Sequence, residues 1–271
     1  MLYHSRMRLG FIGFLATLGL STAAHAGAWV QPQGHGLFIA QASYYSTNSY
    51  FDTNGDKQPQ PRFRKYELQP YAEYGALDWL TTGGSAYAQS VSQSSQSNYG
   101  IADPELFARA RVYTDDVQVV SIQPLIKLPS SFAENSAVRG GSKSTDIELS
   151  ALYGRNLNLI STKDYADVRV GYRQRDRGLS PQWRGDVALG LGITDTIQLI
   201  PALRTVISTN LKDASTFSEG GDLDYNVLKA EVTGVYHLND VQWIQAGIFS
   251  HVAGIQTGDG YGISLGFAQR F

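Results

Sequence analysis

The stretch that decides the fold covers residues 66–74 and reads YELQPYAEY. Apolar or aromatic side chains occupy its even positions, and polar side chains occupy most of its odd positions. Successive side chains of a β-strand point to opposite faces, whereas a helix groups like residues at spacings of three and four. The stretch therefore predicts a strand with one face toward an apolar medium and the other toward a polar one.

The same alternation recurs along the chain and predicts an all-β protein of about twelve strands. Ile147, Leu149 and Ala151, for example, alternate with Glu148 and Ser150. Most of the predicted strands have about 10 residues, the length that a tilted transmembrane strand needs. The predicted strands are residues 36–46, 63–74, 79–90, 103–113, 118–128, 144–153, 165–174, 184–191, 196–208, 225–238, 242–253 and 260–271.

The connections between these strands alternate between short turns and long polar loops, which is typical of outer-membrane β-barrels. The connection at residues 155–163 is the exception, because it is too long for a tight turn. The short turns are 75–78, 114–117, 193–196 and 239–241, and the long loops are 48–62, 91–102, 129–143, 174–183 and 209–224.

We therefore expect an antiparallel up-and-down transmembrane β-barrel with both termini on the periplasmic side. A periplasmic β-sandwich would also alternate, with its polar face toward water. Charges at facing positions in successive strands, and long loops on one side only, argue against a sandwich. Aromatic residues beside the short turns predict an interfacial girdle, and prolines inside strands predict bulges or weak strands. The girdle residues are Tyr74, Trp79, Tyr236 and Trp243, and the prolines are Pro70, Pro124 and Pro201.

The start of the chain predicts a cleaved secretory signal peptide over residues 1–26. Arg6 and Arg8 precede an uncharged apolar run, and Ala24 and Ala26 form a small-x-small cleavage site. The run is too short to span a bilayer, which takes about 20 apolar residues. Residues 27–271 are then one barrel domain, and the predicted location is the cell outer membrane.

The composition narrows the classes of function. The mean hydropathy of -0.21 leaves no apolar surplus for a bundle of membrane helices. The net charge of -2 argues against a nucleic-acid partner. The absence of cysteine excludes disulfides, thiolate metal sites and a cysteine nucleophile. We expect no cofactor and no metal.

The polar faces of the predicted strands carry 10 basic and 8 acidic residues. An Arg or Lys facing lipid costs about 2–4 kcal/mol at the bilayer midplane. We therefore expect these groups to face a lumen, where they either line a conduit or pack a narrow barrel as a salt-bridge plug. Their near-balance of sign argues against strong ion selectivity. The lumen candidates are Lys65, Glu67, Glu105, Arg109, Arg111, Lys127, Glu148, Arg169, Arg204, Lys229 and Glu231.

Arg109, Arg111 and Lys127 form the most basic local cluster of this prediction, one suited to an anionic sugar or a lipid headgroup. Catalytic motifs are weak by comparison. Ser250 and His251 are similar in type to the Ser and His of outer-membrane lipases, but adjacent strand residues point to opposite faces. No catalytic residue is predicted.

The C-terminal strand resembles the targeting strand of bacterial outer-membrane proteins, which the barrel-assembly machinery reads. Tyr261, Ile263, Leu265 and Phe267 share one parity, and the chain stops at Phe271. The resemblance implies that Phe271 is the targeting residue and that the assembly machinery is a partner.

Two further resemblances concern outer-membrane families. Residues 100–106 (GIADPEL), 126–129 (IKLP) and 171–173 (GYR) resemble the "transporter" barrels associated with the meta-cleavage pathway of phenol degradation. Residues 27–29 (GAW), 50–52 (YFD) and 73–75 (EYG) look like the XagA-type proteins of adhesin and exopolysaccharide gene clusters. The resemblance implies a transport or surface-polymer function.

The sequence thus leaves three hypotheses open. The first is a passive conduit or export partner, in contact with outer-membrane lipid, for a small molecule or for an exopolysaccharide or adhesin system. The second is a plugged structural or adhesion barrel that works through its long loops. The third is a lipid-modifying enzyme with His237 or His251 as base.

Overall fold

The computed structural model describes residues 27–129, 131, 141–211 and 224–271, and the predicted signal peptide lies outside them. The described residues form twelve strands, as the alternation predicts. In this part of the chain, no helix is both long and apolar enough to cross a membrane. The strands are β1 (Gly36–Phe51), β2 (Lys57–Leu77), β3 (Leu80–Gln93), β4 (Gln96–Thr114), β5 (Gln118–Lys127), β6 (Asp146–Leu157), β7 (Asp164–Arg175), β8 (Gln182–Gly192), β9 (Ile197–Ser208), β10 (Asn226–His237), β11 (Gln242–Ile255) and β12 (Thr257–Arg270).

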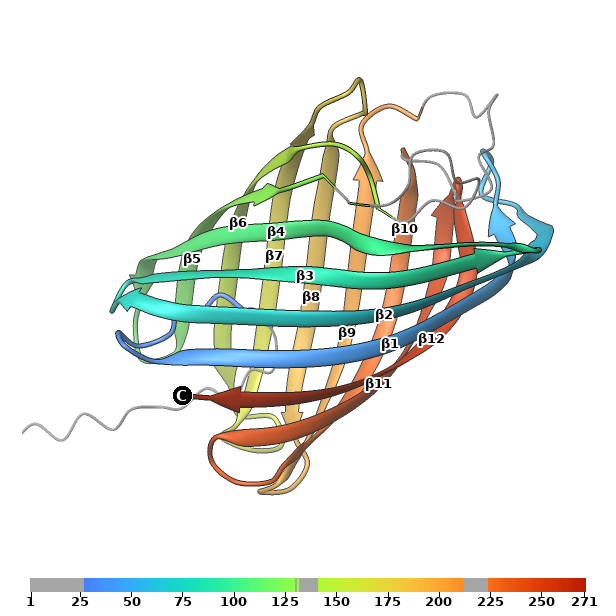
Figure 1. Ribbon diagram of the computed structural model, residues 1–271. Helices are drawn as coiled ribbons and strands as arrows, with labels where there is room; N and C mark the ends of the chain where they lie inside the picture. The colour runs from blue at the N-terminus through green and yellow to red at the C-terminus, as the bar shows by residue number, and fades with distance from the viewer. Residues whose placement is uncertain (1–26, 130, 132–140, 212–223) are drawn as a thin grey trace, which may run out of the picture.

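The strands close into one antiparallel barrel in which each strand pairs with its neighbours in sequence (Figure 1). β1 closes the ring by pairing with β12. The Gly36 amide donates to the Phe271 carbonyl at 2.8 Å, and the Phe271 amide donates back to Gly36 at 3.0 Å. The up-and-down barrel is therefore confirmed, and the sandwich is excluded. We call the end with Gly36 and Phe271 the terminal end and the opposite end the loop end. A periplasmic position for the terminal end stays a prediction.

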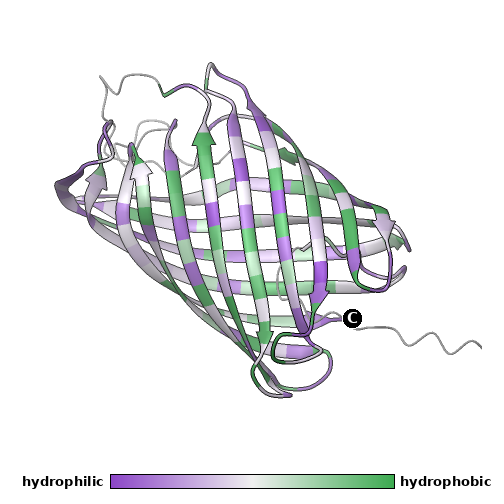
Figure 2. Ribbon diagram, turned by 180° about the vertical axis from the view of Figure 1, so that it is seen from behind, coloured by the Kyte–Doolittle hydropathy of each residue, from purple (hydrophilic) through white to green (hydrophobic). Residues whose placement is uncertain are grey.

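The outer wall of the barrel is apolar, because one parity of every strand points away from the lumen. Figure 2 shows hydrophobic residues alternating with polar ones along the strands. Val187 of β8 lies opposite Leu203 of β9, and both side chains are about half exposed on the outer surface. The fold is that of outer-membrane proteins, whose closed strands leave no unpaired edge in lipid.

The predicted aromatic girdle is correct in placing three of its four members on the outside. Tyr74, Trp79 and Tyr236 are each about half exposed near the terminal end. The prediction for Trp243 is wrong, because this residue is only 1% exposed and its side chain lies inside the barrel. Its odd position on β11 is shared with Gln245, which also points inward, and strand parity decides the face whatever turn lies nearby.

The predicted loops at 48–62 and 91–102 are wrong over most of their length. β1 and β2 are joined by residues 52–56 alone, and β3 and β4 by residues 94–95. Some of their side chains are buried, among them Val91 and Ala102, but polar residues occupy both parities, so no apolar side marks these segments in the sequence. Their backbone ladders still form, and the two hairpins lengthen the barrel wall toward the loop end (Figure 1).

The tip of the β1–β2 hairpin is held by Asp52. Its carboxylate accepts the amides of Asn54 at 2.8 Å and Asp56 at 3.0 Å. These hydrogen bonds hold the pKa of Asp52 below its usual range. The carboxylate thus closes a polar turn.

The bulges predicted at the interior prolines are wrong. Pro70 keeps its pairing with β1, Pro124 with β6 and Pro201 with β10. On the opposite side of each proline the pairing stops and then resumes in the same register. Because proline lacks an N–H, each one removes ladder bonds on one side without inserting a residue.

The apolar wall makes a testable prediction about Leu203. Leu203→Arg places a charge against lipid, so we expect the free energy of unfolding in lipid vesicles to fall by about 2–4 kcal/mol. A urea titration measures the change. Leu159→Arg is the control, because Leu159 is exposed in the connection between β6 and β7, and a change within about 0.5 kcal/mol is expected there. Equal tolerance of both variants argues against a lipid-facing wall.

Candidate functional site

The segment before β1 folds into the barrel (Figure 1). We call residues 27–33 the N-terminal strap. The amide of Ala28 donates to Asp167 of β7 at 2.9 Å, and the hydroxyl of Ser121 of β5 donates to the Ala28 carbonyl at 2.6 Å. Ala28 is fully buried by these contacts. The strap therefore crosses the lumen from the β1 side to the β5–β7 wall.

The strap is also attached to β2 and β3 at the terminal end. The Gln31 amide donates to the Thr81 hydroxyl at 2.7 Å, and the Gly34 amide donates to the Gly75 carbonyl at 3.0 Å. A Cβ on Gly75 would lie 2.1 Å from the carbonyl oxygen of Pro32, so only glycine allows this approach.

One buried arginine links the strap to the barrel wall. Arg109 is fully buried, and its guanidinium donates to the Trp29 carbonyl at 2.8 Å and to Gln123 at 3.0 Å. It also lies 3.4 Å from the Glu73 carboxylate, which accepts the Gln31 side chain at 2.5 Å. A buried charge is tolerated only with such partners, so Arg109 is an anchor of the strap.

The rest of the terminal end is filled by an apolar cluster, which we call the floor. The ring of Trp243 lies in it, with the Arg270 guanidinium carbon 5.2 Å from its centre. These residues are 0% to 7% exposed, so the floor is packed like a protein core. Its members are Leu37, Ile39, Ile200, Val235, Trp243 and Ala268.

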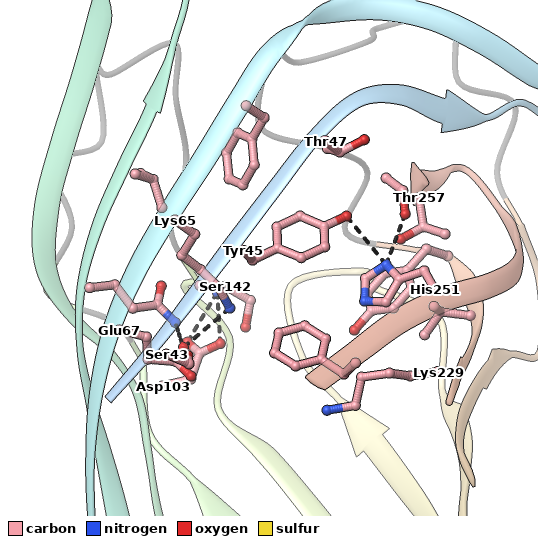
Figure 3. Close-up of a pocket in the computed structure, with 18 of the residues that line it drawn as sticks. Ser43, Tyr45, Thr47, Lys65, Glu67, Asp103, Ser142, Lys229, His251 and Thr257 are labelled. Carbon is pink, nitrogen blue, oxygen red and sulfur yellow. Dashed lines mark hydrogen bonds and ion pairs between the residues drawn. The ribbon is translucent and has the colours of Figure 1, made fainter. Parts of the chain in front are cut away.

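Between the floor and the loop end lies a polar chamber. It consists of two cavities of about 510 and 620 Å³ that share much of their lining. We call them together the central chamber. Figure 3 shows Tyr45, Lys65, Lys229 and His251 around the part nearer the loop end. The chamber is large enough for a small molecule.

Charges of opposite sign alternate from strand to strand on one wall of this chamber, formed by β4 to β7. Glu105, Lys127, Asp146 and Arg175 lie opposite one another on β4, β5, β6 and β7. Lys127 Nζ lies 2.8 Å from Asp146, and Arg175 lies 3.0 Å from Asp224, just before β10. Short ion pairs thus compensate the charges of this row.

A second row continues on the adjoining wall. Arg169, Asp186, Arg204 and Lys229 lie opposite one another on β7 to β10. Arg169 lies 2.7 Å from Asp186, while Arg204 and Lys229 share Glu231 at 3.3 and 3.0 Å. The predicted pairing of lumen charges is therefore observed in the described residues.

The predicted lumen residues divide into two groups. Arg109 and Glu148 are fully buried within the packed wall, and Arg111 lies opposite the buried Ser121 without lining the chamber. The other eight line the chamber: Lys65, Glu67, Glu105, Lys127, Arg169, Arg204, Lys229 and Glu231.

The predicted basic cluster of Arg109, Arg111 and Lys127 is wrong. Lys127 lies opposite Glu105, four residues before Arg109 on the same strand, which is about 13 Å along β4. Arg109 pairs with Glu73 and Lys127 with Asp146, so the cations belong to separate ion-pair groups.

Lys127 also draws the connection between β5 and β6 into the lumen. Its ammonium contacts the hydroxyls of Ser142 and Ser144, and the Ser142 amide donates to Asp103 at 3.0 Å. Ser142 and Ser144 are both buried. This part of the connection therefore narrows the loop end, and strand periodicity gave no sign of it.

The two residues considered for catalysis contact separate groups. His251 Nδ1 lies 2.8 Å from the Gly258 carbonyl and 3.4 Å from the Tyr45 hydroxyl, as Figure 3 shows. The Ser250 hydroxyl instead donates to Gly260 at 3.2 Å. The geometry thus gives the histidine a place in the chamber wall and favours no serine–histidine pair.

Three comparisons place this fold among known proteins. No known family model matches the chain, and no curated protein matches its sequence. The XagA-type and phenol-pathway resemblances therefore stay predictions. Among solved structures, the COG4313 outer membrane channel from Pseudomonas putida F1 is similar, with a TM-score of 0.74, 14% identity, and coverage of 92% of this chain and 100% of that one.

Two other outer-membrane barrels match less closely. The NanC porin has a TM-score of 0.57 at 9% identity, covering 85% of this chain and 98% of that one. The CymD monoaromatic hydrocarbon channel has a TM-score of 0.52 at 9% identity, covering 89% of each chain. At such identities the likeness establishes the fold alone.

The buried anchor predicts a large effect of Arg109→Met. Removing one partner of a buried ion pair typically costs about 3–5 kcal/mol, so we expect the free energy of unfolding to fall by that amount in a urea titration. Arg111→Met is a matched control on the same strand, because Arg111 is half-buried and forms no ion pair with the described residues. A further Glu73→Met should recover part of the loss. Equal losses at Arg109 and Arg111 contradict the assignment.

Proposed function

We propose that this protein is a passive conduit for small hydrophilic molecules across the outer membrane. The observation that carries the proposal is the central chamber, a polar cavity lined by paired charges inside a closed, apolar-walled barrel. The chamber offers a small hydrophilic molecule enough space and polar partners within the barrel. Two of the similar structures are themselves described as channels, which supports the same conclusion.

The strap and the floor obstruct the terminal end of the lumen in this conformation. The chamber lining ends at Tyr71, Gln123 and Asp167, and the strap and floor fill the lumen beyond them. Passage therefore requires the strap to move. It is held by side-chain hydrogen bonds and by packing of Ala28 and Trp29 against Val119 and Leu152, and it contributes a single bridge, Gln33 with Gly75, to the strand ladder. The strap is thus able to leave without opening the barrel wall.

The size of the chamber favours a small cargo over a polymer. The floor belongs to β1, β9, β10, β11 and β12 themselves and cannot leave with the strap. A role in exopolysaccharide or adhesin export, which the sequence resemblance implies, requires a wider passage than strap movement alone gives.

A second candidate is a plugged barrel that works through the surface at its loop end. The strap and the packed floor favour it, because together they obstruct the terminal end. Conductance separates the two candidates, since a plugged barrel carries no ions.

Conductance in planar lipid bilayers tests the proposal. We expect stepwise, stable current increments when the folded protein is added, and none with heat-denatured protein. Complete absence of steps from folded, inserted protein contradicts the conduit and supports the plugged barrel.

The strap is tested by a disulfide, because the chain contains no natural cysteine. Gln31→Cys with Thr81→Cys should form a tether, since the Gln31 amide lies 2.7 Å from the Thr81 hydroxyl. We expect the oxidised pair to lower conductance at least fivefold and a reducing agent to restore it. The single variant Gln31→Cys is the control. Unchanged conductance in the oxidised pair shows that solute passes without strap movement.

A further inference from the structure

Three arginines of the chamber wall converge on one carboxylate. Glu148 is fully buried, and its oxygens lie 2.7 Å from Arg173, 3.8 Å from Arg184 and 4.0 Å from Arg169. One negative charge cannot neutralise three positive ones, so the balance depends on which arginines have other partners.

Two of the three arginines have a second carboxylate. Arg173 lies 2.7 Å from Glu105, and Arg169 lies 2.7 Å from Asp186. Among the described residues, Arg184 has only its 3.8 Å contact with Glu148, and its buried Nε has no hydrogen-bond partner. Arg184 is therefore the least compensated arginine of this group, and it lines both cavities of the chamber.

Three cations on this wall are nearer the open space than the carboxylates that they contact most closely, with Asp186, at 22% exposed, as the exception. The side chains of Arg184, Arg204 and Lys229 are 26% to 32% exposed, whereas Glu148 and Glu231 are 0% and 9% exposed. A solute beside Arg184, Arg204 and Lys229 thus meets guanidinium and ammonium groups, while Glu148 and Glu231 lie deeper and Asp186 is exposed to a similar degree. The numbers of acidic and basic residues are nearly equal, but their depths differ.

The wall across the chamber from these arginines also presents uncharged polar side chains. β1, β2 and β3 lie across the ring from β7, β8 and β9. The chamber lining on β1 to β3 includes several uncharged amides and hydroxyls, which donate to and accept from hydroxyl groups. These residues are Gln41, Ser43, Gln69, Ser85 and Gln89.

We propose that the chamber holds an anion-binding site centred on Arg184, for a small carboxylate that also carries hydroxyls, such as an acidic monosaccharide. The carboxylate pairs with the Arg184 guanidinium, and the hydroxyls contact the amide wall. The proposal deepens the conduit function by naming its substrate class, and it departs from the weak selectivity expected from counting charges.

A binding measurement tests the proposed site independently of transport. Sodium D-glucuronate is the probe and D-glucose is the neutral control, titrated calorimetrically into the folded protein in detergent. We expect glucuronate to bind and glucose not to bind. Arg184→Gln should weaken glucuronate binding at least tenfold, and Arg184→Lys, which keeps the charge, should retain most of it.

Arg155→Gln is the matched control and should leave binding unchanged. Arg155 is exposed, and it follows the inward-facing Leu152 and Gly154 at a position of the other parity on β6. Cooperative thermal unfolding of each variant confirms that it is folded. Equal binding to wild type and Arg184→Gln, or binding of glucose as tight as that of glucuronate, overturns the proposal.

Ion selectivity gives a second readout in planar bilayers. In a tenfold potassium chloride gradient we expect the reversal potential of the wild type to indicate chloride preference, and that of Arg184→Gln to shift toward potassium. Conductance without chloride preference or glucuronate binding overturns the site and keeps the conduit. Glucuronate binding without conductance keeps the site and overturns the conduit.

Discussion

The exclusion of charge and of unpaired backbone groups from lipid is the constraint on which the rest of this structure depends. In a bilayer, every backbone N–H and C=O has to be satisfied within the protein, and a closed barrel satisfies all of them between strands. The same constraint sends one parity of each strand outward as an apolar wall and the other inward with the charges. Closure by β1 and β12 and the polarity of the lumen are therefore two results of one cause.

Confinement of the charges to the lumen determines how they are arranged. Buried charges are destabilising unless they have partners of opposite sign, so acids and bases face each other at many positions of neighbouring strands. Pairing does not make them equivalent, because Glu148 is sealed in the wall while Arg184 reaches the chamber. The depth of each charge, as well as its sign, sets the electrostatic character of the space.

The inward side chains of the twelve strands do not by themselves fill the lumen at the terminal end. On one side, inward apolar residues such as Trp243 pack as a core. On the other side, the chain supplies its own filling by folding the strap against Arg109. The first part belongs to the strands, while the second is a segment outside them, held by hydrogen bonds and by packing of Ala28 and Trp29 against the wall. The proposed conduit function assigns the required movement to the strap, because the floor cannot move without the strands.

The sequence by itself determined the strand number, the antiparallel order and the inward set of charges, because a period of two is a local property that each strand carries alone. It could not give the strap, whose contacts with Asp167 and Arg109 join residues far apart in the chain. Sequence reasoning also placed Trp243 on the outer face and Arg109 beside Lys127. The order of the strands along the chain does not show which residues lie opposite one another. Only the tertiary structure decided the ion-pair partners, the floor and the depth of Arg184, since these depend on which side chains meet when the barrel closes.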